Sequence, residues 1–150
     1  MGWAGRLLGW RREEARAVSV TLTNEFGRIR LSEEALSAIA GYAARECYGI
    51  VGVAARSVPD GIAELLGLES IHRGVEIRVD DGEYVVINLF VIVEYGVNIL
   101  QVARNVMEQV RHRLEQLSGL TVAQVNVHVQ GVRGAESDRR RSHESYSRRA

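Results

Sequence analysis

Residues 84–132 read YVVINLFVIVEYGVNILQVARNVMEQVRHRLEQLSGLTVAQVNVHVQGV. The stretch begins with a long apolar run that a single asparagine interrupts. Apolar residues then recur at helical spacing over 97–118, and Gly119 follows, where a helix commonly ends. An alternating strand over 122–132 closes the stretch. Strand, helix and strand together contain most of the large apolar residues, so this stretch predicts the core of one domain.

The two strands share an alternation that predicts which face of a sheet is covered. The odd positions from 85 to 93 are all apolar, whereas the even positions are mixed. The last strand has valine at 125, 127 and 129 with polar residues between them. Antiparallel sheets commonly cover one face and leave the other to water or a partner. We therefore expect helices on the odd face and an open even face.

This open even face is the candidate interaction surface. Phe90 and Ile92 are expected to leave apolar area facing water there, and contiguous exposed apolar area often marks a contact surface. The residues predicted to form the face are Asn88, Phe90, Ile92, Asn126 and His128.

The segments before residue 84 predict the rest of the fold. Residues 18–31 alternate around an Asn-Glu-Phe-Gly turn, which is typical of a hairpin. Ser32 is a suitable N-cap, and apolar residues then recur at helical spacing as far as Cys47. A second hairpin is predicted around Asp80 to Glu83. The expected fold is α+β: a single domain with a mainly antiparallel sheet covered on one face by two main helices, near 33–47 and 97–118.

Both ends of the chain differ in composition from the domain at 18–132. Residues 1–17 are an amphipathic or flexible extension in which Trp3, Leu7 and Trp10 share a helical face. This face suits peripheral contact with a membrane, or packing on its own domain or on a symmetry partner. Residues 133–150 are rich in arginine and serine, and we expect a disordered tail.

Composition restricts the cellular setting and the chemistry. The chain has 150 residues and a formal net charge of zero, and it contains no lysine, which excludes lysine-based catalysis. With Cys47 as its one cysteine it forms no internal disulfide. We see no signal peptide, and the apolar run is too short to span a bilayer. A cytoplasmic protein is expected, with association at the inner face of the membrane as an open alternative.

No combination of residues predicts catalysis. The four histidines lie in unrelated contexts, and Cys47 has no evident base. We therefore expect a protein that is not an enzyme, with no catalytic, cofactor-binding or metal-binding residues. The alternative is a nucleic-acid-binding module, because Gly49-Ile50-Val51-Gly52 has the letters of the backbone-clamping loop of KH domains and the tail is arginine-rich. A short buried strand also accounts for those letters, and we do not expect a nucleic-acid partner.

Several separated motifs carry a family resemblance. The central ones are EYGVNI at 94–99, VARNV at 102–106, SGL at 118–120 and VNVHVQGV at 125–132. Motifs at 27–34, 49–52 and 61–67 precede them in consistent order. Over about residues 20–132 the chain resembles the alkaline-shock and general-stress (Gls-type) envelope protein family of small bacterial proteins.

The resemblance implies a non-enzymatic protein of cell-envelope homeostasis and stress response. Some members of that family are held at the membrane by a separate anchor protein, so the resemblance implies a membrane-anchor protein as a partner. We also expect the chain to form a homo-oligomer through the open even face. The family supplies no catalytic residues to transfer. Residues 67–74 are predicted to form a loop, in which this chain has Leu68-Glu69 after Gly67, where relatives often carry basic residues. If that loop binds an acidic partner in relatives, the same contact is not expected here.

Overall fold

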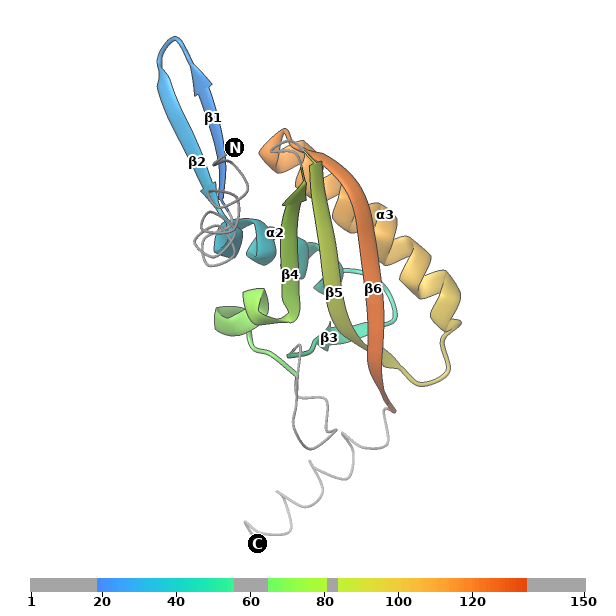
Figure 1. Ribbon diagram of the computed structural model, residues 1–150. Coiled ribbons are helices and arrows are strands. Elements are labelled where there is room, and N and C mark those ends of the chain that lie inside the picture. The colour runs from blue at the N-terminus through green and yellow to red at the C-terminus, as the bar shows by residue number, and fades with distance from the viewer. Residues whose placement is uncertain (1–18, 56–64, 81–83, 135–150) are drawn as a thin grey trace, which may run out of the picture.

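The computed structural model describes residues 19–55, 65–80 and 84–134. The strand that begins at Tyr84 lies at the centre of a four-stranded sheet (Figure 1). β5 (Tyr84–Glu94) pairs antiparallel with β4 (Val75–Asp80) along its first half. The same edge of β5 pairs antiparallel with β3 (Ile50–Val53) near its end. β6 (Thr121–Arg133) runs parallel to β5 along the other edge.

A long helix explains why β6 is parallel to β5. α3 (Ile99–Ser118) has 20 residues, which span about 30 Å and carry the chain back to the end of the sheet where β5 began. A parallel neighbour needs such a crossover. The predicted α+β class with mainly antiparallel pairing is confirmed, and the parallel pair at β5 and β6 makes the main sheet mixed.

The two main helices begin where local capping groups allow. The Ser32 side-chain oxygen accepts a hydrogen bond from the N–H of Ala35 at 3.2 Å, as the sequence predicts, and α2 (Glu33–Arg45) starts there. Asn98 caps α3 in the same way through the N–H of Gln101, at 3.2 Å. Gly119 ends α3 in the left-handed conformation.

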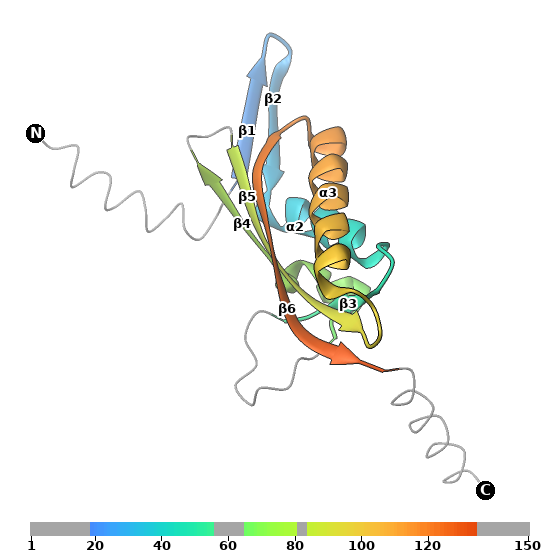
Figure 2. The ribbon, with the colours of Figure 1, turned by 90° about the vertical axis from the view of Figure 1, so that its right-hand side faces the viewer.

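Both helices pack on the odd face of the sheet (Figure 2). The odd residues of β5 from Val85 to Val93 are at most 1% exposed, and they pack against buried residues of α2 and α3. Val122 and Val125 of β6 are buried in the same cluster, and Val127 packs against it. The predicted parity of the two strands is therefore confirmed.

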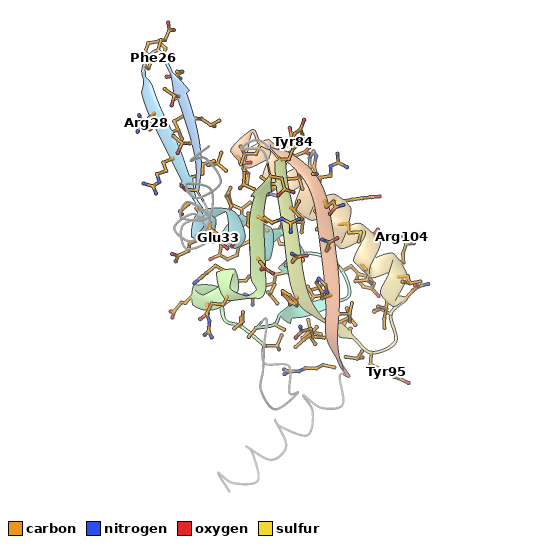
Figure 3. The ribbon with its side chains drawn as sticks, in the orientation of Figure 1. Phe26, Arg28, Glu33, Tyr84, Tyr95 and Arg104 are labelled. Carbon is orange, nitrogen blue, oxygen red and sulfur yellow. The ribbon has the colours of Figure 1, made fainter. Side chains whose placement is uncertain are left out.

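The predicted first hairpin forms a separate two-stranded sheet. β1 (Ser19–Asn24) and β2 (Gly27–Ser32) extend away from the main sheet (Figure 1). Val20 is buried and Leu31 packs against the core, but the next apolar pair, Leu22 and Ile29, is exposed. Phe26 lies at the tip (Figure 3). The hairpin thus joins the core only at its base.

Two segments differ from expectation. The predicted loop at 67–74 contains a 3₁₀ helix, η1 (Leu68–Gly74), whose buried Ile71 packs where Gly41 of α2 leaves room. Arg133, assigned from sequence to the tail, ends β6, and its carbonyl oxygen accepts a 2.9 Å bond from the N–H of Tyr95. The predictions for residues 1–17, for 135–150 and for the turn residues 81–83 lie outside the described residues.

Among the helices that the structure describes, none is both long enough and apolar enough to cross a membrane.

Glu115 joins the last turn of α3 to the start of β6. Its carboxylate oxygen accepts a hydrogen bond from the N–H of Val122 at 3.1 Å and another from Arg111 at 3.4 Å. The hydrogen bond from the Val122 N–H is the main cause of the lowered pKa of the Glu115 carboxyl. Partial desolvation raises this pKa, and Arg111 lowers it further. The bond therefore favours the charged carboxylate.

Replacing Gly49 with alanine should cost more stability than replacing Gly96. Both have a positive φ, of 83° and 98°, so both substitutions carry a strain of about 1–2 kcal/mol. Only at Gly49 would the new Cβ lie 2.7 Å from Val102 on α3, whereas Gly96 has nothing within 4 Å. Overpacking should raise the total cost of Gly49→Ala to about 2–4 kcal/mol. Urea unfolding of both variants measures this; equal losses would refute close packing at Gly49.

A Glu115→Gln variant should show a pH-dependent loss of stability. Because the folded-state pKa is lowered, the stabilisation is present above the ordinary pKa of 4.5 and is lost as pH falls through the folded value. The difference in unfolding free energy from wild type should be largest near neutral pH and shrink below about pH 4.5. Glu108→Gln on the same helix controls for removal of one negative charge. If the stability difference between wild type and Glu115→Gln grows as the pH falls, the hydrogen bond does not favour the charged carboxylate.

Candidate functional site

The even face of the main sheet has no helix over it among the described residues, and Figure 1 views the molecule from this side. Strand register places its side chains in rows that cross β4, β5 and β6. The rows are Arg78–Val86–Gln124, Glu76–Asn88–Asn126 and, on β5 and β6 alone, Phe90–His128.

Two direct contacts order the centre of this face. The side-chain amide of Asn126 donates a hydrogen bond to the side-chain oxygen of Asn88 at 3.0 Å. The Phe90 and His128 rings stack with centroids 4.8 Å apart and an interplanar angle of 17°. Four of the five residues predicted from sequence are therefore brought together, and they are held in place by one another.

Ile92 is the exception, and the prediction that it leaves apolar area facing water is wrong. It is 1% exposed. Its register partners on the two neighbouring strands are Gly52 and Gly131, which leave space beside it. Leu65 fills part of this space, because its methyl carbon lies 2.7 Å from where a Cβ on Gly52 would be. Ile92 therefore belongs to a packed corner of the face.

The face also includes residues that the sequence reasoning missed. Tyr84 is 46% exposed at the start of β5 (Figure 3), and Gln124 is exposed on β6. Arg78 lies at the β4 margin, where it pairs with Asp80 at 3.3 Å. The alternation of Glu76, Arg78 and Asp80 was a usable signal, but only the register shows that these side chains share a face with Asn88.

The glycine-loop interpretation of residues 49–52 is wrong. A KH-type loop joins two helices and exposes its backbone, but here the segment leads into β3. Gly49 and Gly52 are buried, the first against Val102 and the second against Leu65. The tail beyond Gly134, which was the other part of that alternative, lies outside the described residues.

Cys47 is a partly buried residue that packs against the core, as expected. Burial raises the pKa of its thiol, and the negative charge of Glu46 adds to the effect. The thiol donates a hydrogen bond to the carbonyl oxygen of Ala43 at 3.4 Å. Cys47 therefore stays protonated at neutral pH and is a poor nucleophile.

In the part of the chain that the structure describes, no three His, Cys, Asp or Glu side chains are grouped to hold a metal ion.

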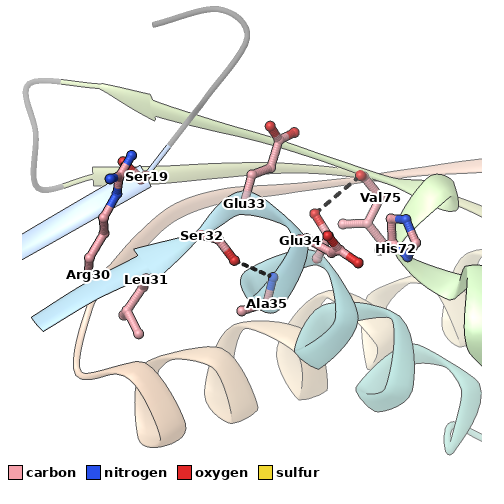
Figure 4. A pocket seen from close by; sticks show the side chains of 10 residues that line it. Ser19, Arg30, Leu31, Ser32, Glu33, Glu34, Ala35, His72 and Val75 are labelled. Carbon is pink, nitrogen blue, oxygen red and sulfur yellow. Dashed lines mark hydrogen bonds between the residues drawn. The ribbon is translucent and has the colours of Figure 1, made fainter.

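A hollow of about 530 Å³ lies where β2, α2 and η1 meet (Figure 4). Glu34 and His72 line it from α2 and η1. The Ser32 hydroxyl caps α2, and the Ser37 hydroxyl donates to the Val75 carbonyl oxygen at 3.4 Å. These serine hydroxyls serve the local structure, so we assign no ligand to the hollow.

Comparison with known proteins supports the resemblance seen in the sequence. Residues 21–134 match the alkaline-shock protein 23 family, described as having a cell envelope-related function. The chain is 43% identical to the protein YloU of Bacillus subtilis (strain 168) over 117 residues, which cover 77% of this chain and 97% of that protein. A protein of Streptococcus pyogenes serotype M6 is 32% identical over 117 residues, covering 77% of this chain and 96% of that one.

A second Bacillus subtilis protein, YqhY, is 30% identical over 107 residues, which cover 71% of this chain and 77% of that protein. No solved structure matches the chain. The family match includes the described strands and helices, except the first two residues of β1, together with the whole candidate face. The chain belongs to the alkaline-shock protein 23 family of cell envelope-related proteins.

Proposed function

We propose that this protein is a non-enzymatic binding module of cell-envelope homeostasis that docks on a partner protein through the even sheet face. The observation that carries the proposal is the ordered pair of contacts on that face, the Phe90–His128 stack and the Asn88–Asn126 hydrogen bond. They lie on a side of the sheet that no described helix covers.

The chemistry of the face favours a protein as its partner. Aromatic residues are enriched in the centres of protein interfaces, where charged residues are depleted. The centre of this face has two rings and two amides on β5 and β6, and the charged side chains lie at the β4 margin: Glu76 beside Asn88, and Arg78 paired with Asp80. A nucleic-acid surface instead needs clustered basic residues. A partner strand or loop with flat apolar groups and hydrogen-bonding groups would fit the face.

Mutual contacts on the face also lower the cost of binding. Immobilising a side chain at an interface costs about 0.5–1.5 kcal/mol, and this cost falls if the side chain is already ordered. Phe90 and Asn88 are half-buried and are held by neighbours on β6 before any partner arrives.

A membrane-anchored protein is the partner that we propose. The family's description connects the chain to the cell envelope, and the described helices cannot cross a membrane. An anchor protein would supply the membrane attachment. In this arrangement the anchor contacts the even face while α2 and α3 face away from it. The protein then acts at the inner face of the membrane.

Photo-crosslinking inside the native host tests the proposal. Tyr84, on the central strand, is replaced by a photoreactive phenylalanine derivative, and the matched control replaces Tyr48, which is 80% exposed beyond the end of α2. Light should join position 84 to a specific protein that fractionates with membranes and should leave position 48 without that adduct. Adding Asn88→Arg to the Tyr84 variant should reduce the adduct at least tenfold, because an uncharged centre of the face gains a charge.

Three results would count against the proposal. If circular dichroism shows that the variant is folded but light gives no protein adduct at position 84, the face has no partner. An adduct with RNA would assign the face to nucleic acid. An adduct of equal yield at positions 84 and 48 would show contact without specificity. Ile92 is not used as a probe, because it is buried and a substitution there would report on folding.

A further inference from the structure

The outer edge of β6 is not paired with another strand among the residues that the structure describes. β6 bonds to β5 along one side, and no described strand pairs with the other. Such an edge presents backbone N–H and C=O groups to which another strand can add, and natural proteins usually protect it with proline, charged side chains, bulges or a short strand. β6 has 13 residues without proline, and its two register irregularities lie near its ends, so the stretch from Gln124 to Val129 between them is regular.

The sequence of β6 is nearly symmetric in residue class about Val127. Moving outward from Val127, the chain reads the same in both directions by residue class: Asn126 and His128, Val125 and Val129, Gln124 and Gln130, Ala123 and Gly131, Val122 and Val132. Antiparallel pairing with a second copy about a two-fold axis at Val127 would place each residue opposite its counterpart. Valine would then meet valine, and amide or imidazole would meet a polar side chain.

The observed register also directs the symmetric valine side chains of β6 to the same face of the sheet. Irregularities in the β5–β6 ladder near both ends leave all five valines of β6 opposite the odd, buried residues of β5. The two-fold pairing maps this set onto itself, so the apolar side of one strand continues into the apolar side of the other. The valines are Val122, Val125, Val127, Val129 and Val132.

An exposed apolar strip lies beside the same edge. Val129 and Val132 are exposed, although their side chains point to the helix side of the sheet. On α3, Asn105, Gln109 and Arg113 line the groove toward α2. At 100° per residue, Leu100 and Met107 lie on the opposite flank, and both are exposed. Figure 1 shows α3 reaching past β6 on that outer side.

We propose that two copies of this chain pair antiparallel through their β6 edges, with Val127 on the two-fold axis. The two four-stranded sheets would form one continuous sheet, and the outer flanks of the two α3 helices would cover the exposed valines. A second copy fits better than an unrelated strand because the symmetric register matches every valine and places no like charges opposite each other. This inference does not rest on the proposed docking of the even face.

Register-specific disulfide trapping tests the pairing. In a Cys47→Ala background, full-length Asn126→Cys and His128→Cys chains carrying different tags are mixed under reducing conditions and then oxidised. Directly opposite Cβ atoms lie about 4.5–5.5 Å apart, whereas diagonal ones lie about 7–8 Å apart. The mixed disulfide should therefore form at least five times more than either homodimeric product. Random association would make the mixed product only twice as abundant as each homodimer, and that result would overturn the register.

Sedimentation of untrapped protein tests the edge itself. Val132→Glu, at a position that is 49% exposed, should weaken dimerisation at least tenfold because the charge enters an apolar contact twice. Leu68→Glu on η1, at a position that is 51% exposed, is the matched control and should leave the dimer unchanged. A wild-type chain that stays monomeric up to about 0.1 mM would overturn the proposal. So would a Val132→Glu chain that dimerises as tightly as wild type.

Discussion

The burial of β5 is the constraint on which the rest of the structure depends. Its backbone is paired along both edges, and its odd side chains are at most 1% exposed beneath two helices. A strand in this position cannot shift by one residue without turning its valines and leucine toward the even face. The helices, β6 and the capping groups at Ser32 and Asn98 all take positions that keep the odd face covered. The even face is then left to the polar and aromatic residues.

The sequence alone was enough to predict the parts of the fold that depend on local patterns. The alternation of β5 and β6 predicted the covered face, and Ser32 and Gly119 marked helix ends that the structure has. The parallel direction of β6 was not predicted, because alternation is the same in parallel and antiparallel strands. It follows from the length of α3, which returns the chain to the end of the sheet where β5 began.

Local sequence patterns predict only part of the candidate face. Asn88, Phe90, Asn126 and His128 could be grouped from parity alone, because both strands keep a period of two through that region. Ile92 has the same parity, yet it is buried by an arrangement that joins three distant segments. The space beside it depends on glycines in β3 and β6, and the residue that enters this space, Leu65, belongs to neither strand. No pattern within β5 records these contacts.

The same strand, β6, contributes to both proposed interactions, and the geometry of a sheet keeps them separate. Side chains of a strand project perpendicular to the sheet, whereas its backbone hydrogen bonds lie in the plane. Asn126 and His128 project from the even face, and the outer backbone edge of β6, which pairs with no described strand, points sideways. Edge pairing would therefore leave the Phe90–His128 stack accessible and place two copies of it on one continuous surface. Two linked sites bind a clustered partner more tightly than one without any new contact. A small binding protein would gain its selectivity for assembled partners from this arrangement.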